Sequence, residues 1–168
     1  MKSLFQSTRG ITLIELLTAV VIIGIVSAMA VPRFQIAWER LSIRSADRNI
    51  ISTVRLARST AIATKEPHGV YFDGNALSIT LFKDVANPSA FVFEPGDSVI
   101  RTDTLPVEFN FLGTDMTNDV LVFRPNGSAA FTGGGNISAM ATTEKVVGIL
   151  NHNVLASTGR IHSSSSFY

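Results

Sequence analysis

The amino-acid sequence predicts an α+β protein in which a long N-terminal helix packs on an antiparallel β-sheet body. Three observations predict this fold: an apolar run near the start of the chain, a segment of helical periodicity after it, and short strand-like runs beyond residue 67. The chain has 168 residues and only 16% are charged, which is low for a soluble domain. The apolar excess lies in residues 11–31, where 16 of 21 side chains are apolar. The chain therefore combines one apolar segment with one ordinary domain.

Residues 11–31 are long enough to cross a lipid bilayer. As a helix they would span roughly 32 Å at about 1.5 Å per residue, which matches a hydrocarbon core of about 30 Å. The residues before them are polar and include Lys2 and Arg9 but no acid. Because positive flanks stay in the cytoplasm, we expect a single-pass membrane protein whose C-terminal body is exported.

Glu15 is the only charged residue of the apolar segment. A carboxylate in a bilayer costs a few kcal/mol, so it points to a function and to a partner. A secretory signal peptide cut after Ala28-Met29-Ala30 and a plain membrane anchor are the alternatives, but both leave Glu15 without a role. Cleavage after Gly10 would create an α-amino group on Ile11, largely protonated at neutral pH, as the nearest cation.

Residues 32–66 have the periodicity of an amphipathic stem helix with one face on a core. Gly24 and Pro32 disfavour a helix interior, so we expect a bend or a weak section of helix between them. The apolar positions, three or four residues apart with few exceptions, are Phe34, Trp38, Leu41, Ile43, Ala46, Ile50, Val54, Ala57 and Ala61.

Charge is divided unevenly between the stem and the body. Residues 33–66 carry seven basic and three acidic side chains, and residues 67–168 carry five and nine. Arg40, Arg44 and Arg48 lie four residues apart and form a stripe along the predicted helix. This stripe is a solvated face, a contact for the acidic body of a neighbouring molecule, or a contact for nucleic-acid phosphates. The net charge of +1 and the acidic body disfavour the last reading.

Residues 67–168 have the pattern of a β-rich body. Asp73-Gly74-Asn75 predicts a hairpin, and Pro125-Asn126-Gly127 predicts a second turn. We expect Gly133-Gly134-Gly135 to be a flexible loop and Ser163–Ser166 a polar tail. The predicted strands are His68–Asp73, Ala76–Phe82, Ala90–Glu94, Ser98–Arg101, Val107–Phe111, Val120–Arg124, Ser128–Thr132, Val146–Asn151, Asn153–Ser157 and Arg160–Ser163.

The sequence contains little that could support catalysis. It has no cysteine, which excludes disulfides, thiol catalysis and cysteine-ligated zinc. Its three histidines, at positions 68, 152 and 162, lack the spacing of metal ligands. Asp115, Asn118 and Asp119 partly match a calcium loop, but the full ligand spacing is missing and an ordinary polar turn is the preferred interpretation. We therefore expect no enzyme activity, cofactor or metal site.

The stretch Arg9-Gly10-Ile11-Thr12-Leu13-Ile14-Glu15-Leu16-Leu17 resembles the class III signal of type IV pilins and type II secretion pseudopilins. The resemblance implies a pilin-like fold, cleavage between Gly10 and Ile11 by a prepilin peptidase, N-methylation of Ile11, and assembly into a filament through Glu15. Ile11 departs from the phenylalanine that is usual there. In this family the helix around Gly24 and Pro32 can lose order in the filament.

The resemblance also implies a division of the chain and its location. Residues 1–10 would be the leader peptide, 11–31 the transmembrane and assembly helix, 32–66 the stem helix, and 67–168 the periplasmic β-rich body. The protein would lie in a bacterial inner membrane before it enters a filament. Its implied partners are other minor and major pilins or pseudopilins, prepilin peptidase, the inner-membrane assembly platform and membrane lipid.

Three further stretches resemble the GspH/FimT family of minor pseudopilins and minor pilins: residues 54–62 (VRLARSTAI), 123–127 (FRPNG) and 157–161 (STGRI). This implies a minor subunit that helps to initiate or cap a type II secretion pseudopilus or a type IV pilus. The alternative is a DNA-binding minor pilin of natural transformation, in which Arg160 and the basic stripe would contact nucleic acid. No second arginine follows Arg160.

Overall fold

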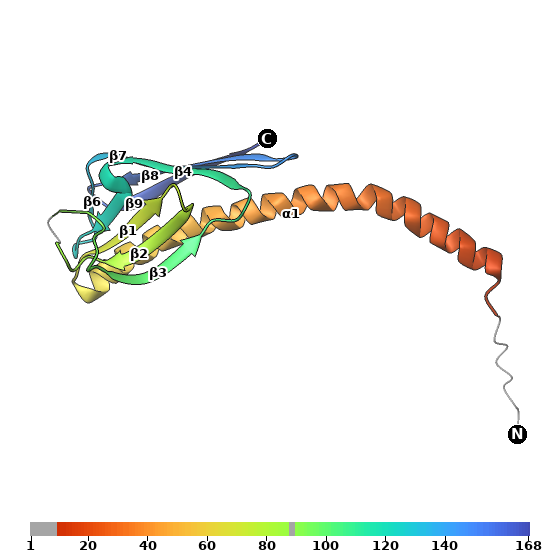
Figure 1. Cartoon of the computed structure of the whole chain (residues 1–168), viewed down its shortest axis with the longest axis horizontal. Helices are drawn as coiled ribbons and strands as arrows, with labels where there is room; N and C mark the ends of the chain where they lie inside the picture. The colour runs from red at the N-terminus through yellow and green to blue at the C-terminus, as the bar shows by residue number, and fades with distance from the viewer. Residues whose placement is uncertain (1–9, 88–89) are drawn as a thin grey trace, which may run out of the picture. The chain divides into compact units, whose positions relative to one another are not determined.

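The computed structural model describes residues 10–87 and 90–168, so most of the predicted leader lies outside the described residues. The helix α1 spans Leu13–Thr64 and is followed by the strands of the body (Figure 1). The chain divides into two compact units, of which the first ends at Ala37 and the second is Trp38–Tyr168.

The helix α1 continues without interruption through Gly24 and Pro32. Pro32 has no N–H, so the helix lacks one backbone hydrogen bond at that turn. Gly24 has no neighbouring atom within 4 Å of the place where a Cβ would lie. The structure therefore has no break in the helix here, and loss of helical order during assembly stays a prediction.

The body contains two antiparallel sheets, and together with α1 they confirm the predicted α+β architecture. A five-stranded sheet has the order β3-β2-β1-β5-β6, and a four-stranded sheet has the order β4-β7-β8-β9. The first consists of β1 (His68–Asp73), β2 (Ser78–Lys83), β3 (Ser98–Thr104), β5 (Val120–Phe123) and β6 (Ala129–Ala130). The second consists of β4 (Phe109–Met116), β7 (Gly133–Thr142), β8 (Val147–Leu155) and β9 (Arg160–Phe167), and the 3-10 helix η1 (Thr117–Asp119) precedes β5.

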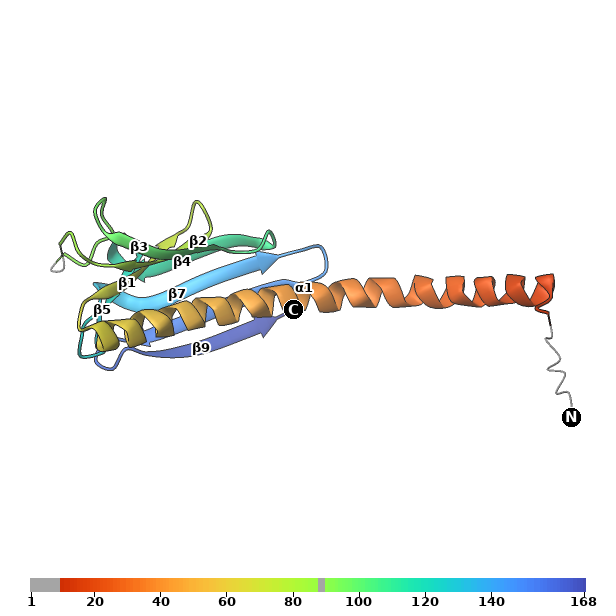
Figure 2. The ribbon, with the colours of Figure 1, turned by 90° about the horizontal axis from the view of Figure 1, so that it is seen from below.

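The part of α1 within the second unit runs along the four-stranded sheet (Figure 2). A Cβ on Gly148 of β8 would lie 2.9 Å from Cγ2 of Ile43, so helix and strand are in close contact there. Phe34, Trp38 and Leu41 were predicted on this face but are exposed, so the core face begins only at Ile43. The buried helix residues are Ile43, Ala46, Ile50, Thr53, Val54, Ala57 and Ala61.

The predicted strand Ala90–Glu94 is wrong, because this segment is a loop. Phe91 has a φ of 53°, which a strand does not allow. The ring of Phe93 stacks on Tyr71 with 5.1 Å between centroids and lies 4.9 Å from Phe82. The apolar residues of the segment 90–94 therefore cover the five-stranded sheet rather than extend it. This packing explains why the segment has a strand-like pattern in the sequence.

The glycine run and the last strands also differ from the prediction. Gly133-Gly134-Gly135 begins β7 instead of forming a loop, and the backbone and carboxylate of Asp115 leave no room for side chains beside Gly133 and Gly134. Residues 163–166 are part of β9 rather than a tail. The two strands predicted on either side of His152 form the single strand β8. Of the predicted strand Ser128–Thr132, only β6 forms.

The connection between β2 and β3 is held by one carboxylate and contains a second, buried one. Asp97 accepts backbone hydrogen bonds from Val85 and Ala86 at 3.0 Å and from Glu94 at 2.9 Å. Burial opposes ionisation of Asp97, but these N–H donors hold its pKa below the usual range. Asp84 is 2% exposed, and neither carboxylate oxygen has a partner among the described residues. Burial, and then the charges of Asp97 and Glu94, raise the pKa of Asp84.

We predict that removing the charge of Asp84 raises the free energy of unfolding at pH 7, whereas removing the charge of Asp97 lowers it. The raised pKa means that protonated Asp84 stabilises the fold below pH about 4, and this contribution is lost as the pH rises through the raised pKa. Asp84→Asn should therefore unfold at higher urea than the parent at pH 7, with a smaller difference at pH 4. Asp97→Asn should lose about 1.5 kcal/mol or more at pH 7, because hydrogen bonds to a charged acceptor weaken. Destabilisation by both variants at pH 7 would contradict the prediction for Asp84.

Candidate functional site

The start of α1 is formed by the residues of the candidate processing signal. Thr12 caps the helix, because its Oγ1 accepts a hydrogen bond from the backbone N–H of Glu15 at 3.3 Å. The carbonyl of Thr12 accepts a further bond from the N–H of Leu16 at 3.2 Å. Thr12 and Glu15 thus have the spacing of a capping box. The helix begins directly after Gly10 and Ile11, which are exposed and lie ahead of its first turn.

Glu15 is exposed in the first turn of α1, and no ion pair joins its side chain to any residue within 10–87 or 90–168. A carboxylate there interacts favourably with the N-terminal end of the helix dipole. Its helical neighbours Ile14 and Leu16 are apolar, 64% and 59% exposed. Among the residues that the structure describes, Glu15 is therefore an acid without a cationic partner on an apolar helix.

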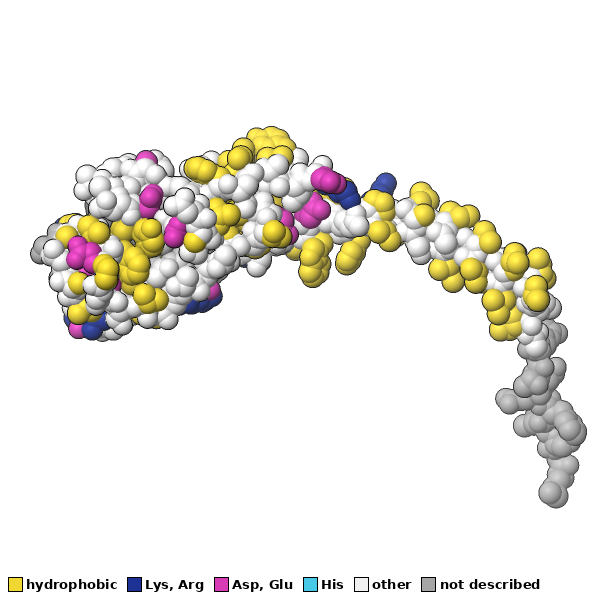
Figure 3. Space-filling model, in the orientation of Figure 1, with side chains coloured by type: hydrophobic (Ala, Val, Ile, Leu, Met, Phe, Trp, Pro, Cys, Tyr) yellow, Lys and Arg dark blue, Asp and Glu magenta, His cyan; other side chains and the backbone are white. Residues whose placement is uncertain are grey.

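The start of α1 is apolar on its surface as well as in its sequence. Hydrophobic side chains follow this part of α1 on the side shown in Figure 3. The helix contains an 18-residue window with a mean hydropathy of 2.5, and none of that window is buried by the described protein. Exposed apolar surface of this extent is unfavourable in water, so the segment requires lipid or other apolar helices around it.

The four candidate arginines do not form one cluster. Arg40 and Arg48 are exposed on α1, and the guanidinium of Arg44 lies 5.2 Å from the ring centroid of Phe167, at the end of β9. Arg160 lies at the other end of β9, seven positions before Phe167, which corresponds to about 24 Å of strand. A nucleic-acid contact that uses Arg160 together with Arg44 would have to bridge this distance.

The three stretches that resemble the GspH/FimT family meet at the end of α1. Nε of Arg58 donates a hydrogen bond of 3.0 Å to the carbonyl oxygen of Gly127, in the turn between β5 and β6. Gly159, in the turn before β9, has a φ of 62°, and a Cβ there would lie 2.9 Å from Nε of Arg58. A Cβ on Gly127 would lie 2.8 Å from Cδ1 of Ile62. We call Arg58, Gly127 and Gly159 the Arg58 junction.

A buried polar pair joins the stem to the four-stranded sheet, and sequence reasoning missed it. Nε2 of His152 lies 3.1 Å from Oδ1 of Asp47, and the histidine side chain is fully buried. The two residues are 105 positions apart, and the only sequence signal was a histidine at an inward position of a strand. His68 is also buried, and its Nδ1 lies 3.0 Å from the carbonyl oxygen of Glu66.

The two acidic residues of the partial calcium pattern bind other protein groups. Asp115 accepts hydrogen bonds of 2.6 Å from the backbone N–H and from Nδ2 of Asn136. Asp119 accepts one of 2.7 Å from Thr114. Within residues 10–87 and 90–168 there is no group of three acidic, histidine or cysteine side chains that could hold a metal ion.

These features define a class of protein: an α+β body and one long helix that begins with a prepilin-type processing signal and with a glutamate that has no ion-pair partner among the described residues. Residues 6–31 match the family model of the prokaryotic N-terminal methylation motif. The match supports a type IV pilin-like protein that is processed by prepilin peptidase and assembles with other pilins. Comparison of the chain with curated proteins and with solved structures finds no match.

We predict that Arg58 has a structural role that its neighbour Arg55 lacks. Arg58→Ala should lower the free energy of unfolding by about 1–3 kcal/mol, because the carbonyl of Gly127 loses its side-chain donor. Arg55, an exposed arginine one turn earlier, is the matched control, and Arg55→Ala should change the value by less than about 0.5 kcal/mol. Urea denaturation of the detergent-solubilised chain, followed by circular dichroism, measures both. Equal losses in the two variants would show that the junction contributes nothing.

Proposed function

We propose that this protein is a minor pilin or minor pseudopilin of the GspH/FimT kind that helps to initiate or cap a type IV pilus or a type II secretion pseudopilus. The observation that carries this proposal is the Arg58 junction. Three short stretches resemble that family, and their residues contact one another although they lie far apart in the chain. A set of chance matches would have no reason to meet in one place.

The proposed processing step fits the exposure of the cleavage site. Gly10 and Ile11 are exposed, and no atom lies within 4 Å of the place of a Cβ on Gly10. Cleavage of the Gly10–Ile11 peptide bond would leave an α-amino group on Ile11, and methylation of that nitrogen would keep its positive charge. This amine would lie close in sequence to the unpaired Glu15 and could bind the glutamate of a neighbouring subunit.

The charge distribution supports contact between the stem of one subunit and the body of the next. The segment 33–66 has an excess of four positive charges, whereas residues 67–168 have an excess of four negative charges. Arg48 and Arg55 line a surface groove of about 540 Å³ together with the apolar side chains of Ile51 and Leu56. Such a groove offers charge and apolar area to an acidic partner surface. In this proposal its occupants are other pilins, and the assembly platform acts on the membrane side.

The first prediction of this proposal concerns the mature N-terminus. Mass spectrometry of the protein purified from membranes should find N-methylated Ile11 as the first residue. The matched control is Gly10→Val, in which the chain should keep its full length because a branched side chain directly before the cut would crowd the bond in the peptidase site. A mature chain that begins at Val31 would indicate ordinary secretion and would overturn the proposal.

The second prediction concerns the charge of Glu15. Glu15→Ala and Glu15→Gln should both be processed, but their incorporation into sheared filaments should fall about ten-fold or more, as expected when an ion pair worth about 1.4 kcal/mol or more is lost. Glutamine is the decisive substitution, because it keeps the size and the helix-start position while it removes the charge. Normal incorporation of Glu15→Gln would refute the pairing of the amine with the carboxylate.

A further inference from the structure

Two large apolar side chains of α1 are exposed at the start of the body unit. Trp38 is 65% exposed and Leu41 is 59% exposed, whereas Ile43 and Ala46 are buried against the sheet. Ideal helix geometry places Leu41 on the side of α1 opposite its buried face and Trp38 on the flank of that face. They therefore contribute little to the core of this chain, and their exposure calls for another environment.

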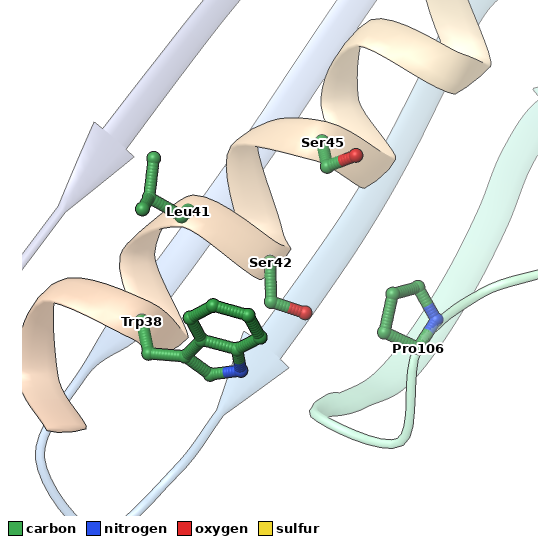
Figure 4. Close-up of a pocket in the computed structure, with 5 residues that line it drawn as sticks. All are labelled: Trp38, Leu41, Ser42, Ser45 and Pro106. Atoms are coloured by element: carbon green, nitrogen blue, oxygen red, sulfur yellow. The ribbon is translucent and has the colours of Figure 1, made fainter.

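Trp38 and Leu41 line a groove of about 330 Å³ with Ser42, Ser45 and Pro106. Figure 4 shows the indole of Trp38 on the side of the helix that faces Pro106, with the hydroxyl of Ser42 between them. The groove thus combines an aromatic ring, an aliphatic side chain and hydroxyl groups. An amphipathic molecule fits this mixture better than a purely apolar one.

The connection between β3 and β4 presents a third apolar side chain next to the groove. Val107 directly follows Pro106 and is 96% exposed. The turn is fixed on both sides, because the N–H of Leu105 donates to Leu77 at 2.8 Å and the N–H of Phe109 donates to Pro106 at 3.0 Å. Val107 is therefore held outward by an ordered turn. We call Trp38, Leu41 and Val107 the Trp38 patch.

Trp38 follows the end of the predicted span closely in the sequence. It comes seven residues after Val31, and both residues belong to α1. The polar zone on each side of the hydrocarbon core is about 5–8 Å thick, and tryptophan is enriched there. Arg33 and Arg40 lie on either side of Trp38 in the chain and can bind anionic headgroups.

We propose that the Trp38 patch docks the body of the unassembled subunit on the phospholipid headgroup layer. The proposal requires only that residues 11–31 span a membrane, and it goes beyond the role of the protein in a filament. The patch has three apolar side chains, too few for a stable protein interface, which buries about 800 Å² on each partner. A headgroup layer needs no matching partner surface and accepts an indole, an aliphatic tip and two arginines together.

Trp38 is the only tryptophan of the chain and so reports its own environment. The experiment uses the full chain in vesicles of phosphatidylethanolamine and phosphatidylglycerol, with lipids brominated near the glycerol backbone or near the methyl end. Because indole prefers the headgroup level, shallow bromine should cause roughly a two-fold loss of Trp38 emission, and deep bromine little loss. Equal quenching at both depths, or none, overturns the proposal.

Trp38 could be quenched simply because it is close to the membrane span in the sequence. A second reporter, far from the span in the sequence, tests whether the body itself docks. In Trp38→Phe/Val107→Trp the reporter lies on the turn, about 70 residues away in sequence, and shallow bromine should quench it as well. The control is Trp38→Phe/Leu56→Trp, because Leu56 is 43% exposed on the same side of α1, five turns further on, and should not be quenched. Val107 is so exposed that its replacement leaves the fold intact, which circular dichroism can verify.

Two further outcomes would overturn the proposal. If only Trp38 is quenched and the Val107→Trp reporter is not, the body does not dock and the proposal fails. If neither reporter is quenched at low protein density but both become shielded as density rises, a second copy covers the patch and the proposal fails. Processing and filament incorporation are measured separately, so this failure leaves the proposed function intact, and its success does not depend on that function.

Discussion

The close packing of the second half of α1 against β8 is the constraint on which the rest of the body depends. Gly148 has no side chain where Ile43 meets the strand, and the small residues Ala46 and Ala57 continue the buried face. Asp47 and His152 form a polar contact within this interface, and the Arg58 junction closes its far end. Because the buried face occupies only one side of the helix, the basic stripe and the Trp38 patch remain on the surface, where other molecules can bind.

The sequence predicted the large elements well because each has a periodic signal of its own. The apolar run, the amphipathic stem and the hairpin at Asp73-Gly74-Asn75 depend on local spacing, and β1 and β2 pair as that turn implies. The errors arose where tertiary contacts replaced local signals. Residues 90–93 are apolar because this segment covers the sheet, with Phe93 against Tyr71 and Phe82. The glycine run at 133–135 exists because Asp115 approaches it, which no local pattern reveals.

The candidate sites also divide into those that depend on local sequence and those that depend on tertiary contacts. Gly10, Ile11 and Glu15 could be found from sequence because their chemistry depends on order along one helix. Asp47 and His152, or Arg58 and Gly127, meet only when distant segments fold together, so their pairing could not be predicted from spacing. Trp38 was placed on the core face because it shares a three- to four-residue spacing with Phe34 and Leu41. Trp38 is 65% exposed whereas Ile43 and Ala46 are buried, so the core face begins only at Ile43.

If the proposed function is right, Glu15 is the residue whose free energy differs most between the membrane and the filament. The apolar side chains of residues 11–31 gain little when they leave lipid for other apolar helices, because both surroundings are equally apolar. An unpaired carboxylate in lipid costs a few kcal/mol, and pairing it with the amine of a neighbouring chain recovers part of that cost. The helix-start geometry of Thr12 and Glu15 keeps this carboxylate in the first turn, close to the new N-terminus. A single charge at a defined position can therefore favour assembly where apolar surface alone cannot.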